Sequence, residues 1–389
     1  MRSARPPRGP RRLGRQPRPR RMGGTRMSRR LDVALVGLGA RGRYWFEVLR
    51  RDPRVRVSAL VDPSPEARAS FTASAAEPPT YADLDAALGQ AHVDALVLAT
   101  PPGTREAHLE LAIRDQLPVL AEKPLSLDLA EASRFVRNAQ NAGIPLMVGL
   151  NFRYLDVTKK TRTLLADGTV GQPEFARFTY ERWRDGHRPG INRYPLTMHH
   201  PMLWEQSIHH LDLLRYVYDD EPTEIHARTF NPSWSMYAGD ANVLATVQFE
   251  SGRLVSYQGT WQSSHVTPNF EWRTECDAGI SVQRDQFGDL AYARRDEATL
   301  TEVPLEPHET WITDTSGVLD AFLRHLLDGD PLECSGADHL RSLAMIEACV
   351  RSSASHAPVS VPALLDEVAA VPLATPGDAR TPRQEVDMT

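Results

Sequence analysis

The chain contains 389 residues, a length that predicts two domains rather than one. Hydrophobic residues make up 41% and charged residues 24%, as in soluble globular proteins. No run of about 18 apolar residues occurs, which excludes a membrane-spanning helix and predicts no membrane partner. The three cysteines, Cys276, Cys334 and Cys349, are too scattered for a disulfide framework or a zinc motif, so we expect a reducing, cytoplasmic location.

Charge is distributed unevenly along the chain. Residues 1–30 hold twelve arginines and no acidic residue, and since the whole chain has a net charge of −5, residues 31–389 carry −17. So acidic a body predicts no nucleic-acid partner. The Arg/Pro-rich head is expected to be disordered, either as a solvated tail or because translation starts at Met22 or Met27; a basic interaction arm is the alternative. Residues 364–389, polar and proline-bearing, are expected to form a flexible tail.

The first chemical motif is a glycine loop between an apolar strand, expected over 31–36, and an amphipathic helix. The loop reads Gly37-Leu38-Gly39-Ala40-Arg41-Gly42. Gly37 permits the tight turn, Gly39 the close approach of a pyrophosphate, and Gly42 the packing of helix on strand. The motif predicts a dinucleotide-binding loop, with a simple glycine-rich turn as the alternative.

A second strand, over 55–61, ends at Asp62, which lies 20 residues after Gly42. At this place dinucleotide-binding folds hold a carboxylate that binds the adenosine ribose hydroxyls. Such a carboxylate would repel a 2′-phosphate, so we expect NAD as cofactor. Arg41 and Arg43 could bind such a phosphate, so NADP stays an alternative cofactor.

The strand–helix pattern then repeats. Strands are expected at 93–99, 118–121 and 145–148, with helices at about 105–115 and 126–143 between them. Their carboxyl ends carry Thr100-Pro101-Pro102, then Glu122-Lys123-Pro124, then Asn151 and Arg153. Alternation predicts a parallel sheet with right-handed crossovers, so these groups and the glycine loop would line one crevice. A lysine and a carboxylate at the end of a buried strand indicate a ligand site, beside which Asn151 and Arg153 are candidates for substrate contact.

The second half of the chain has a different order of predicted strands and helices. Strands are expected at 175–180, 224–229, 242–249, 253–261 and 272–275, and helices at 157–166, 317–327 and 339–352. Their alternation predicts an open, largely antiparallel sheet with one covered face. We therefore expect an α/β Rossmann domain over 31–150 and an α+β substrate and oligomerisation domain over 151–363.

One helix of this half, expected over 202–218, carries ionisable residues along one stripe. Glu205, His209 and Asp212 are spaced i, i+4 and i+7 and would share a face. An imidazole between carboxylates is a natural proton-transfer group, because the acids fix its tautomer. The alternatives are a core hydrogen-bond network and a metal site that also uses His210. No further ligand cluster completes such a site, so we expect no metal.

Trp183 lies just after the strand at 175–180, among Arg184, Asp185, His187 and Arg188. A tryptophan with polar neighbours suits stacking on a sugar face and recognition of hydroxyl groups. A surface loop is an equal alternative.

In their order these motifs resemble the Gfo/Idh/MocA oxidoreductases, which include glucose–fructose oxidoreductase and inositol dehydrogenase. The matching residues are Val36 to Gly42, Ala99 to Pro102 with His108, Ala121 to Pro124, and Ser207 to Asp212. The resemblance covers about 31–362 and implies a Rossmann domain followed by a domain with an open sheet often used for oligomer contacts, so we expect a homo-oligomer, a dimer or tetramer. It implies catalytic roles for Lys123 and His209, and cofactor contacts from the glycine loop, Asp62, Thr100 to Pro102, His108, Glu122 and Lys123.

The chain departs from the family pattern at one place. The family usually has Asp-x-Gly-x-His, whereas Glu205 replaces the aspartate and Ser207 the glycine here. Glutamate keeps the charge but extends its reach by one methylene, which bears on substrate geometry.

Together these observations predict an NAD(P)-dependent dehydrogenase acting on a secondary alcohol of a sugar, polyol or inositol-like substrate. His209 would take the hydroxyl proton, Lys123 would hydrogen-bond the same oxygen, and Glu205 and Asp212 would orient His209 or bind neighbouring hydroxyls. Two alternatives stay open: NAD-dependent glycoside cleavage by transient oxidation, and a non-enzymatic regulator that senses a dinucleotide.

Overall fold

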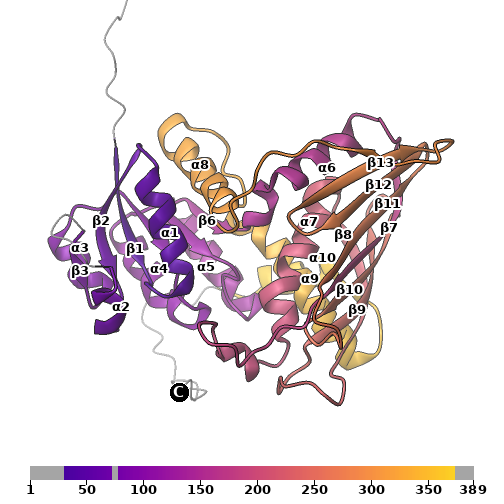
Figure 1. Cartoon of the computed structure of the whole chain (residues 1–389). Coiled ribbons are helices and arrows are strands. Elements are labelled where there is room, and N and C mark those ends of the chain that lie inside the picture. The colour runs from indigo at the N-terminus through magenta and orange to yellow at the C-terminus, as the bar shows by residue number, and fades with distance from the viewer. Residues whose placement is uncertain (1–29, 72–77, 373–389) are drawn as a thin grey trace, which may run out of the picture.

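The structure, a computed structural model, describes residues 30–71 and 78–372, which form two domains side by side (Figure 1). The predicted disordered head, apart from Arg30, and residues 373–389 of the predicted tail lie outside the described residues. No helix in the described ranges combines the length and apolarity needed to cross a bilayer.

The first domain is built on a parallel sheet with strand order β3-β2-β1-β4-β5-β6. The strands are β1 (Leu31–Val36), β2 (Val55–Val61), β3 (Thr80–Tyr81), β4 (Ala95–Leu98), β5 (Val119–Glu122) and β6 (Leu146–Gly149). Every residue of β1, β4, β5 and β6 is buried, because helices cover both faces of a doubly wound sheet. The predicted Rossmann sheet is confirmed; β3, with two residues, is too short to show a pattern.

The helices of this domain are α1 (Ala40–Arg51), α2 (Pro65–Ala69), α3 (Leu84–Gln90), α4 (Arg105–Arg114) and α5 (Leu129–Ala142). Their ends follow ordinary capping chemistry. The Asp128 side chain accepts a hydrogen bond from the Glu131 amide and caps α5, which begins at Leu129, three residues later than predicted. Gly143, with φ of +70°, ends it in the left-handed conformation.

The second domain contains a nine-stranded sheet with order β14-β13-β12-β11-β7-β10-β9-β8-β15. Its strands are β7 (Pro173–Glu181), β8 (Pro222–Phe230), β9 (Asn242–Phe249), β10 (Leu254–Thr260), β11 (Asn269–Cys276), β12 (Gly279–Asp285), β13 (Gly288–Arg294), β14 (Thr301–Glu302) and β15 (Val359–Ser360). Every pairing is antiparallel except that of β7 with β10, which confirms the largely antiparallel sheet. The strands β12 to β15 were not predicted, because two are very short and the β12–β13 hairpin carries charged ends.

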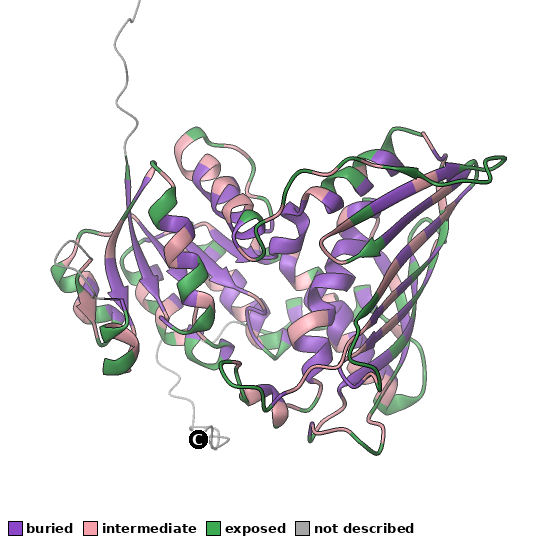
Figure 2. Cartoon of the chain, in the orientation of Figure 1, coloured by how far each residue is buried: buried purple, intermediate pink, exposed green. Residues whose placement is uncertain are grey.

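Helices cover only one face of this sheet, as Figure 1 shows for α6 (Asp156–Ala166), α7 (Ile208–Tyr218) and α9 (Gly336–Ser355). Buried and exposed residues alternate along its strands (Figure 2), as they do in β9. Helix α8 (Thr313–Asp328), although late in the chain, packs on α1 and β6 of the first domain.

The C-terminal boundary differs from the prediction. Helix α10 (Val361–Ala369) continues past residue 363, and its Leu364 and Val368 are buried. These two residues, four apart, lie on one helix face that packs on α9, so residues 364–369 belong to the folded domain rather than to a tail.

The start of α9 joins the two domains. The Val148 amide of β6 donates to the Cys334 carbonyl oxygen at 2.9 Å, which covers the edge of the parallel sheet. The Leu125 amide, just after β5, donates to His339 Nε2 at 3.2 Å. The carboxyl ends of β5 and β6 are therefore fixed relative to the second domain.

Candidate active site

The three glycines of the loop between β1 and α1 have different roles. Gly37 has φ of +93°, and a Cβ there would lie 2.8 Å from the Ala99 carbonyl carbon. A Cβ on Gly42 would lie 2.1 Å from the Gly37 oxygen. At Gly39, in contrast, no atom lies within 4 Å of the Cβ position. Gly37 and Gly42 thus allow the backbone to pack closely, whereas Gly39 leaves space for a ligand.

The amino end of α1 faces this space with its amides available. Gly39 caps the helix without a side-chain hydrogen bond, and the first turn contains no acidic residue. Free amides and the helix dipole at such an end favour an anion. Asp62, at the end of β2, anchors the loop, because it accepts hydrogen bonds from the Leu38 amide at 2.8 Å and the Ser64 amide at 2.9 Å. This set of groups fits the pyrophosphate and ribose of a dinucleotide.

Arg41, a candidate from the sequence for binding the 2′-phosphate of NADP, has other partners in the structure. Its Nε donates to Glu122 Oε1 at 2.5 Å, and a terminal nitrogen donates to Thr315 Oγ1 of α8 at 2.9 Å. Arg43 makes an exposed contact with Ser70. Arg41 therefore connects the glycine loop to β5 and to α8, which removes one of the two reasons for keeping NADP open.

Glu122 is a buried anion at the end of β5. It accepts hydrogen bonds from Arg41 and, at 2.6 Å, from Trp45 Nε1. Burial opposes its ionisation, but the charges of Arg41 and Lys123 and these hydrogen bonds hold the pKa of Glu122 below its ordinary value. Glu122 thus fixes the glycine loop against the strand that carries Lys123.

Lys123 meets the second domain directly. Its Nζ donates to the Glu205 carbonyl oxygen at 2.9 Å and lies 3.3 Å from Glu205 Oε2. An ammonium group has three N–H donors. Within the described residues two of them are directed at Glu205, so one remains for a substrate oxygen.

Glu205 lies in η4, a π-helical turn (Leu203–Ser207) that leads into α7. A regular α-helix had been predicted here, with Glu205, His209 and Asp212 on one stripe. Among the described residues, however, Glu205 makes no hydrogen bond to His209. Glu205 contacts Lys123 and, through Oε1, accepts a hydrogen bond from Tyr194 at 2.7 Å. The prediction that Glu205 orients His209 is wrong.

His209 is buried and stacks on Phe152, with ring centroids 4.2 Å apart and planes at 20°. Burial, and then the charge of Lys123, lower the pKa of His209 well below its ordinary value, so the ring is neutral. Its Nδ1 has no hydrogen-bond partner among the described residues. Phe152, rather than a carboxylate, fixes the ring plane, and the neutral imidazole is able to accept a proton.

Asp212 and Arg153 pair with each other away from these groups. Arg153 donates to the two Asp212 oxygens at 2.7 and 2.5 Å, and the Ser342 hydroxyl donates to Asp212 at 2.6 Å. Both side chains are buried, and a buried charge needs such a partner. The predictions that Asp212 orients His209 and that Arg153 contacts substrate are therefore corrected: the pair is structural.

Asn151 has a similar structural contact, because its amide donates to Asp314 of α8. The expected substrate contact from Asn151 would have to share that amide. Burial raises the pKa of Asp314, and its second oxygen has no partner within the described residues.

The end of β4 is held by Arg105, a residue that the sequence reasoning missed. Arg105 is fully buried and donates to the carbonyl oxygens of Thr100, at 2.8 Å, and Pro124. It thereby ties the Thr100-Pro101-Pro102 segment to the Glu122-Lys123-Pro124 segment. The available signal was a charged residue on the inner face of α4. On the same helix, burial lowers the pKa of His108, whose Nδ1 has no partner in the described part of the chain.

Trp183 is half-buried after β7 and forms an isolated backbone bridge with Gln262. The neighbouring Arg184 lies 4.3 Å from the Trp261 ring and donates to the Tyr237 hydroxyl at 2.9 Å. The loop is thus tied to the end of β10, and sugar stacking on Trp183 stays a prediction.

The metal alternative has no geometric support. His210 bonds to the Tyr257 hydroxyl at 2.9 Å and to Gln206 at 3.0 Å, whereas Asp212 binds Arg153 and Glu205 binds Lys123. Three of the four proposed ligands thus bind different partners, and the fourth, His209, stacks on Phe152.

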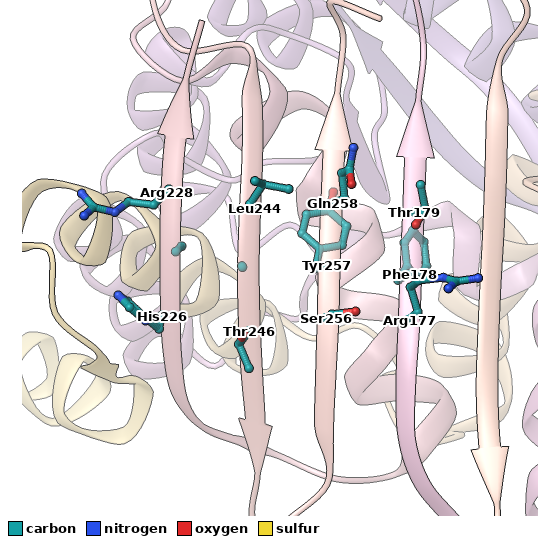
Figure 3. A pocket seen from close by; sticks show the side chains of 12 residues that line it. Arg177, Phe178, Thr179, His226, Arg228, Leu244, Thr246, Ser256, Tyr257 and Gln258 are labelled. Carbon is teal, nitrogen blue, oxygen red and sulfur yellow. The ribbon is translucent and has the colours of Figure 1, made fainter.

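Two surface hollows lie away from this site. One, of about 280 Å³, covers the outer face of β8, β9, β10 and β7 (Figure 3). The other, of about 580 Å³, lies beyond the end of α7 and is lined by charged residues such as Arg162 and Asp219. Neither is lined by Lys123 or His209.

Comparison with known proteins identifies both domains. Residues 31–150 match the family model described as oxidoreductase family, NAD-binding Rossmann fold, and residues 158–277 match the GFO/IDH/MocA C-terminal domain. A D-apiose dehydrogenase of Paraburkholderia graminis is 26% identical over 364 residues, which cover 90% of this chain and 95% of that protein.

An inositol 2-dehydrogenase of Rhizobium meliloti is 24% identical over 339 residues, which cover 84% of this chain and 98% of that protein. Among solved structures, an oxidoreductase from Agrobacterium radiobacter in complex with NAD+, L-tartaric acid and magnesium superposes with a TM-score of 0.79 at 22% identity. That match covers 86% of this chain and 99% of the other. The two family models together span more than half of the chain, which therefore belongs to the GFO/IDH/MocA family of NAD(P)-dependent oxidoreductases.

Proposed function

We propose that the protein is an NAD-dependent dehydrogenase that oxidises a secondary alcohol of a sugar, polyol or inositol-like substrate. The observation that carries this proposal is the contact between Lys123 Nζ and Glu205. It brings the strand-end lysine of the dinucleotide-binding domain to the helix that bears His209. The names of the relatives support the substrate class.

The chain's own groups would handle the proton. The neutral His209 ring accepts the hydroxyl proton, and the remaining N–H of Lys123 donates to the same oxygen and stabilises its developing charge. Glu205 holds Lys123 in position. NAD, when bound, provides the nicotinamide carbon that accepts the hydride.

The preference for NAD over NADP rests on two residues. Asp62 lies beside the amino end of α1, where its carboxylate would repel a 2′-phosphate, and Arg41 is engaged by Glu122 and Thr315. Titration with both cofactors tests this preference. We expect NAD+ to bind at least about tenfold more tightly, and Asp62→Ser to narrow the difference.

The substrate class is tested by a panel of inositols, pentoses, hexoses and linear polyols, with cofactor reduction and product formation followed together. We expect turnover on at least one of them with NAD+, and its loss in Lys123→Met. The matched control is Lys160→Met, which replaces an exposed lysine of α6. NAD+ binding without turnover on the whole panel would contradict the dehydrogenase proposal and favour the regulator.

Glycoside cleavage by transient oxidation is the second candidate, because it would use the same Lys123 and His209. Release of aglycone from glycosides, with no net NADH, would favour it over simple oxidation.

We also propose that the protein forms a homo-oligomer in the cytoplasm through the outer face of the large sheet. Leu244, which Figure 3 shows on this face, is 45% exposed, and the alternation along β7 and β10 places Phe175 and Leu254, 58% and 48% exposed, on the same face. The helices cover only the opposite face (Figure 1). The three cysteines are free and buried, as a reducing compartment allows. Light scattering should give a dimer or tetramer, and Leu244→Lys should shift it toward the monomer.

A further inference from the structure

We propose that Tyr194 is a positioning residue that fixes the Glu205 carboxylate and, through it, the ammonium group of Lys123. This inference rests on the proposed dehydrogenase function. No catalytic or binding role had been predicted for Tyr194 from the sequence.

The two oxygens of the Glu205 carboxylate have different partners. Oε1 accepts the hydrogen bond from the Tyr194 hydroxyl at 2.7 Å, and Oε2 lies 3.3 Å from Lys123 Nζ. The Glu205 carbonyl oxygen accepts from the same Nζ at 2.9 Å. A carboxylate that is held at both oxygens cannot rotate freely, so the direction of the remaining Lys123 N–H is set as well.

The tyrosine is suited to donate. Tyr194 is half-buried, and burial followed by the charge of Glu205 raises its pKa above the ordinary value. Its hydroxyl therefore stays protonated, and its hydrogen is available to the carboxylate.

The arrangement depends on the length of the Glu205 side chain. An aspartate, the residue usual in the family, would hold its carboxylate about 1.5 Å further back, the length of one carbon–carbon bond. From there the carboxylate could not reach both the Tyr194 hydroxyl and Lys123 Nζ, although the carbonyl oxygen of residue 205 would still accept a hydrogen bond from Nζ. The longer side chain of Glu205 and the Tyr194 hydroxyl thus act together to position Lys123.

The loop that carries Tyr194 is supported by the second domain. Tyr194 begins the short helix η3 (Tyr194–Leu196), in the segment between β7 and η4 that runs below the two domains in Figure 1. The Ala238 amide donates to the Leu196 oxygen at 2.8 Å, and the Arg184 amide donates to the Trp261 oxygen at 2.9 Å. Backbone contacts on both sides of Tyr194 therefore hold it in place.

The test combines Tyr194→Phe with Glu205→Asp, singly and together. Because the Tyr194 hydroxyl donates to Glu205 and would act only through it, we expect Tyr194→Phe to lower kcat about tenfold with KM changed less than about twofold. Glu205→Asp should cause a similar loss, and Tyr194→Phe should add little in that background. Tyr218→Phe is the matched control, since its buried hydroxyl bonds to Thr274 and Trp272 and to neither Glu205 nor Lys123. Equal kcat for Tyr194→Phe and wild type, or losses that simply multiply, would overturn the inference.

A second readout does not need turnover. Labelling of Lys123 by an amine-reactive reagent, followed by mass spectrometry, should be several-fold faster in Tyr194→Phe than in wild type and unchanged in Tyr218→Phe. If labelling is faster in Tyr194→Phe but the wild type turns over no substrate, the role of Tyr194 in holding Lys123 is supported and the proposed dehydrogenase function is rejected. Turnover by the wild type, with kcat and labelling both unaffected by Tyr194→Phe, would reject the inference alone.

Discussion

The two domains contribute to the site in different ways. In the Rossmann domain each group stands at the end of a strand or the start of a helix, as Lys123 and Asp62 do, so its place follows from chain order and sheet topology. In the second domain Glu205 and Tyr194 are placed by a π-turn and a loop. Their place depends on packing, which a periodic pattern does not describe. Variants in each domain separate these two kinds of control.

The largest expected effect lies in the second domain, at Asp212. Asp212→Ala would remove the bidentate partner of the buried Arg153, which would keep its ion pair with Asp338 at 2.7 Å, so we expect a loss at the lower end of the range of about 3–5 kcal/mol. Chemical denaturation should show this decrease in the free energy of unfolding, whereas kcat of the folded fraction should stay within a few-fold of wild type. The exposed Asp328→Ala is the control. If Asp212→Ala has normal stability but no activity, Asp212 acts in catalysis, as the sequence predicted, and is not a structural residue.

In the Rossmann domain two glycine variants should act differently. Gly42→Ala brings a Cβ to 2.1 Å from the Gly37 oxygen, and we expect about 1–3 kcal/mol of destabilisation together with loss of NAD+ binding. Gly39→Ala meets no atom of the chain, so stability should change by less than about 0.5 kcal/mol while NAD+ affinity falls about tenfold. Thermal unfolding with and without NAD+ measures both effects. Wild-type NAD+ affinity in Gly39→Ala would show that the open space is not the pyrophosphate site.

The effect that is smallest at neutral pH concerns two buried histidines, because it develops only as pH falls below about 6.5. Burial lowers the pKa of His210 and of His339 to about 3, so the folded protein does not take up these protons as pH falls from about 6.5, whereas the unfolded chain does. Stability is therefore highest above pH 6.5 and decreases toward pH 3, by up to about 1.4 kcal/mol per pH unit for each histidine. Denaturation at several pH values should give a shallower dependence in His210→Gln and an unchanged one in the exposed His226→Gln. An unchanged slope in His210→Gln would refute this assignment.

The two domains also differ in how much of the site could be predicted from the sequence. The glycine loop, Asp62 and the Glu122-Lys123 pair were placed correctly on one edge, because parallel strands leave few choices. Asp212 was misassigned, because its partner Arg153 lies 59 residues away and no pattern links the two.

Glu205 was placed on the correct helix but given the wrong neighbour, because its partners Lys123 and Tyr194 lie 82 and 11 residues away and no periodic pattern links them to it. Tyr194 was missed altogether, since its loop has no periodicity and only the fold brings it to Glu205.

The central claim is that Lys123 and His209 together handle the substrate proton. Its most direct test is single-turnover hydride transfer by Lys123→Ala and His209→Ala, with NAD+ bound and the substrate identified in the panel. We predict that each variant slows hydride transfer about 100-fold or more, and that His209→Ala keeps its affinity for NAD+. Rates within a few-fold of wild type in both variants would contradict the account.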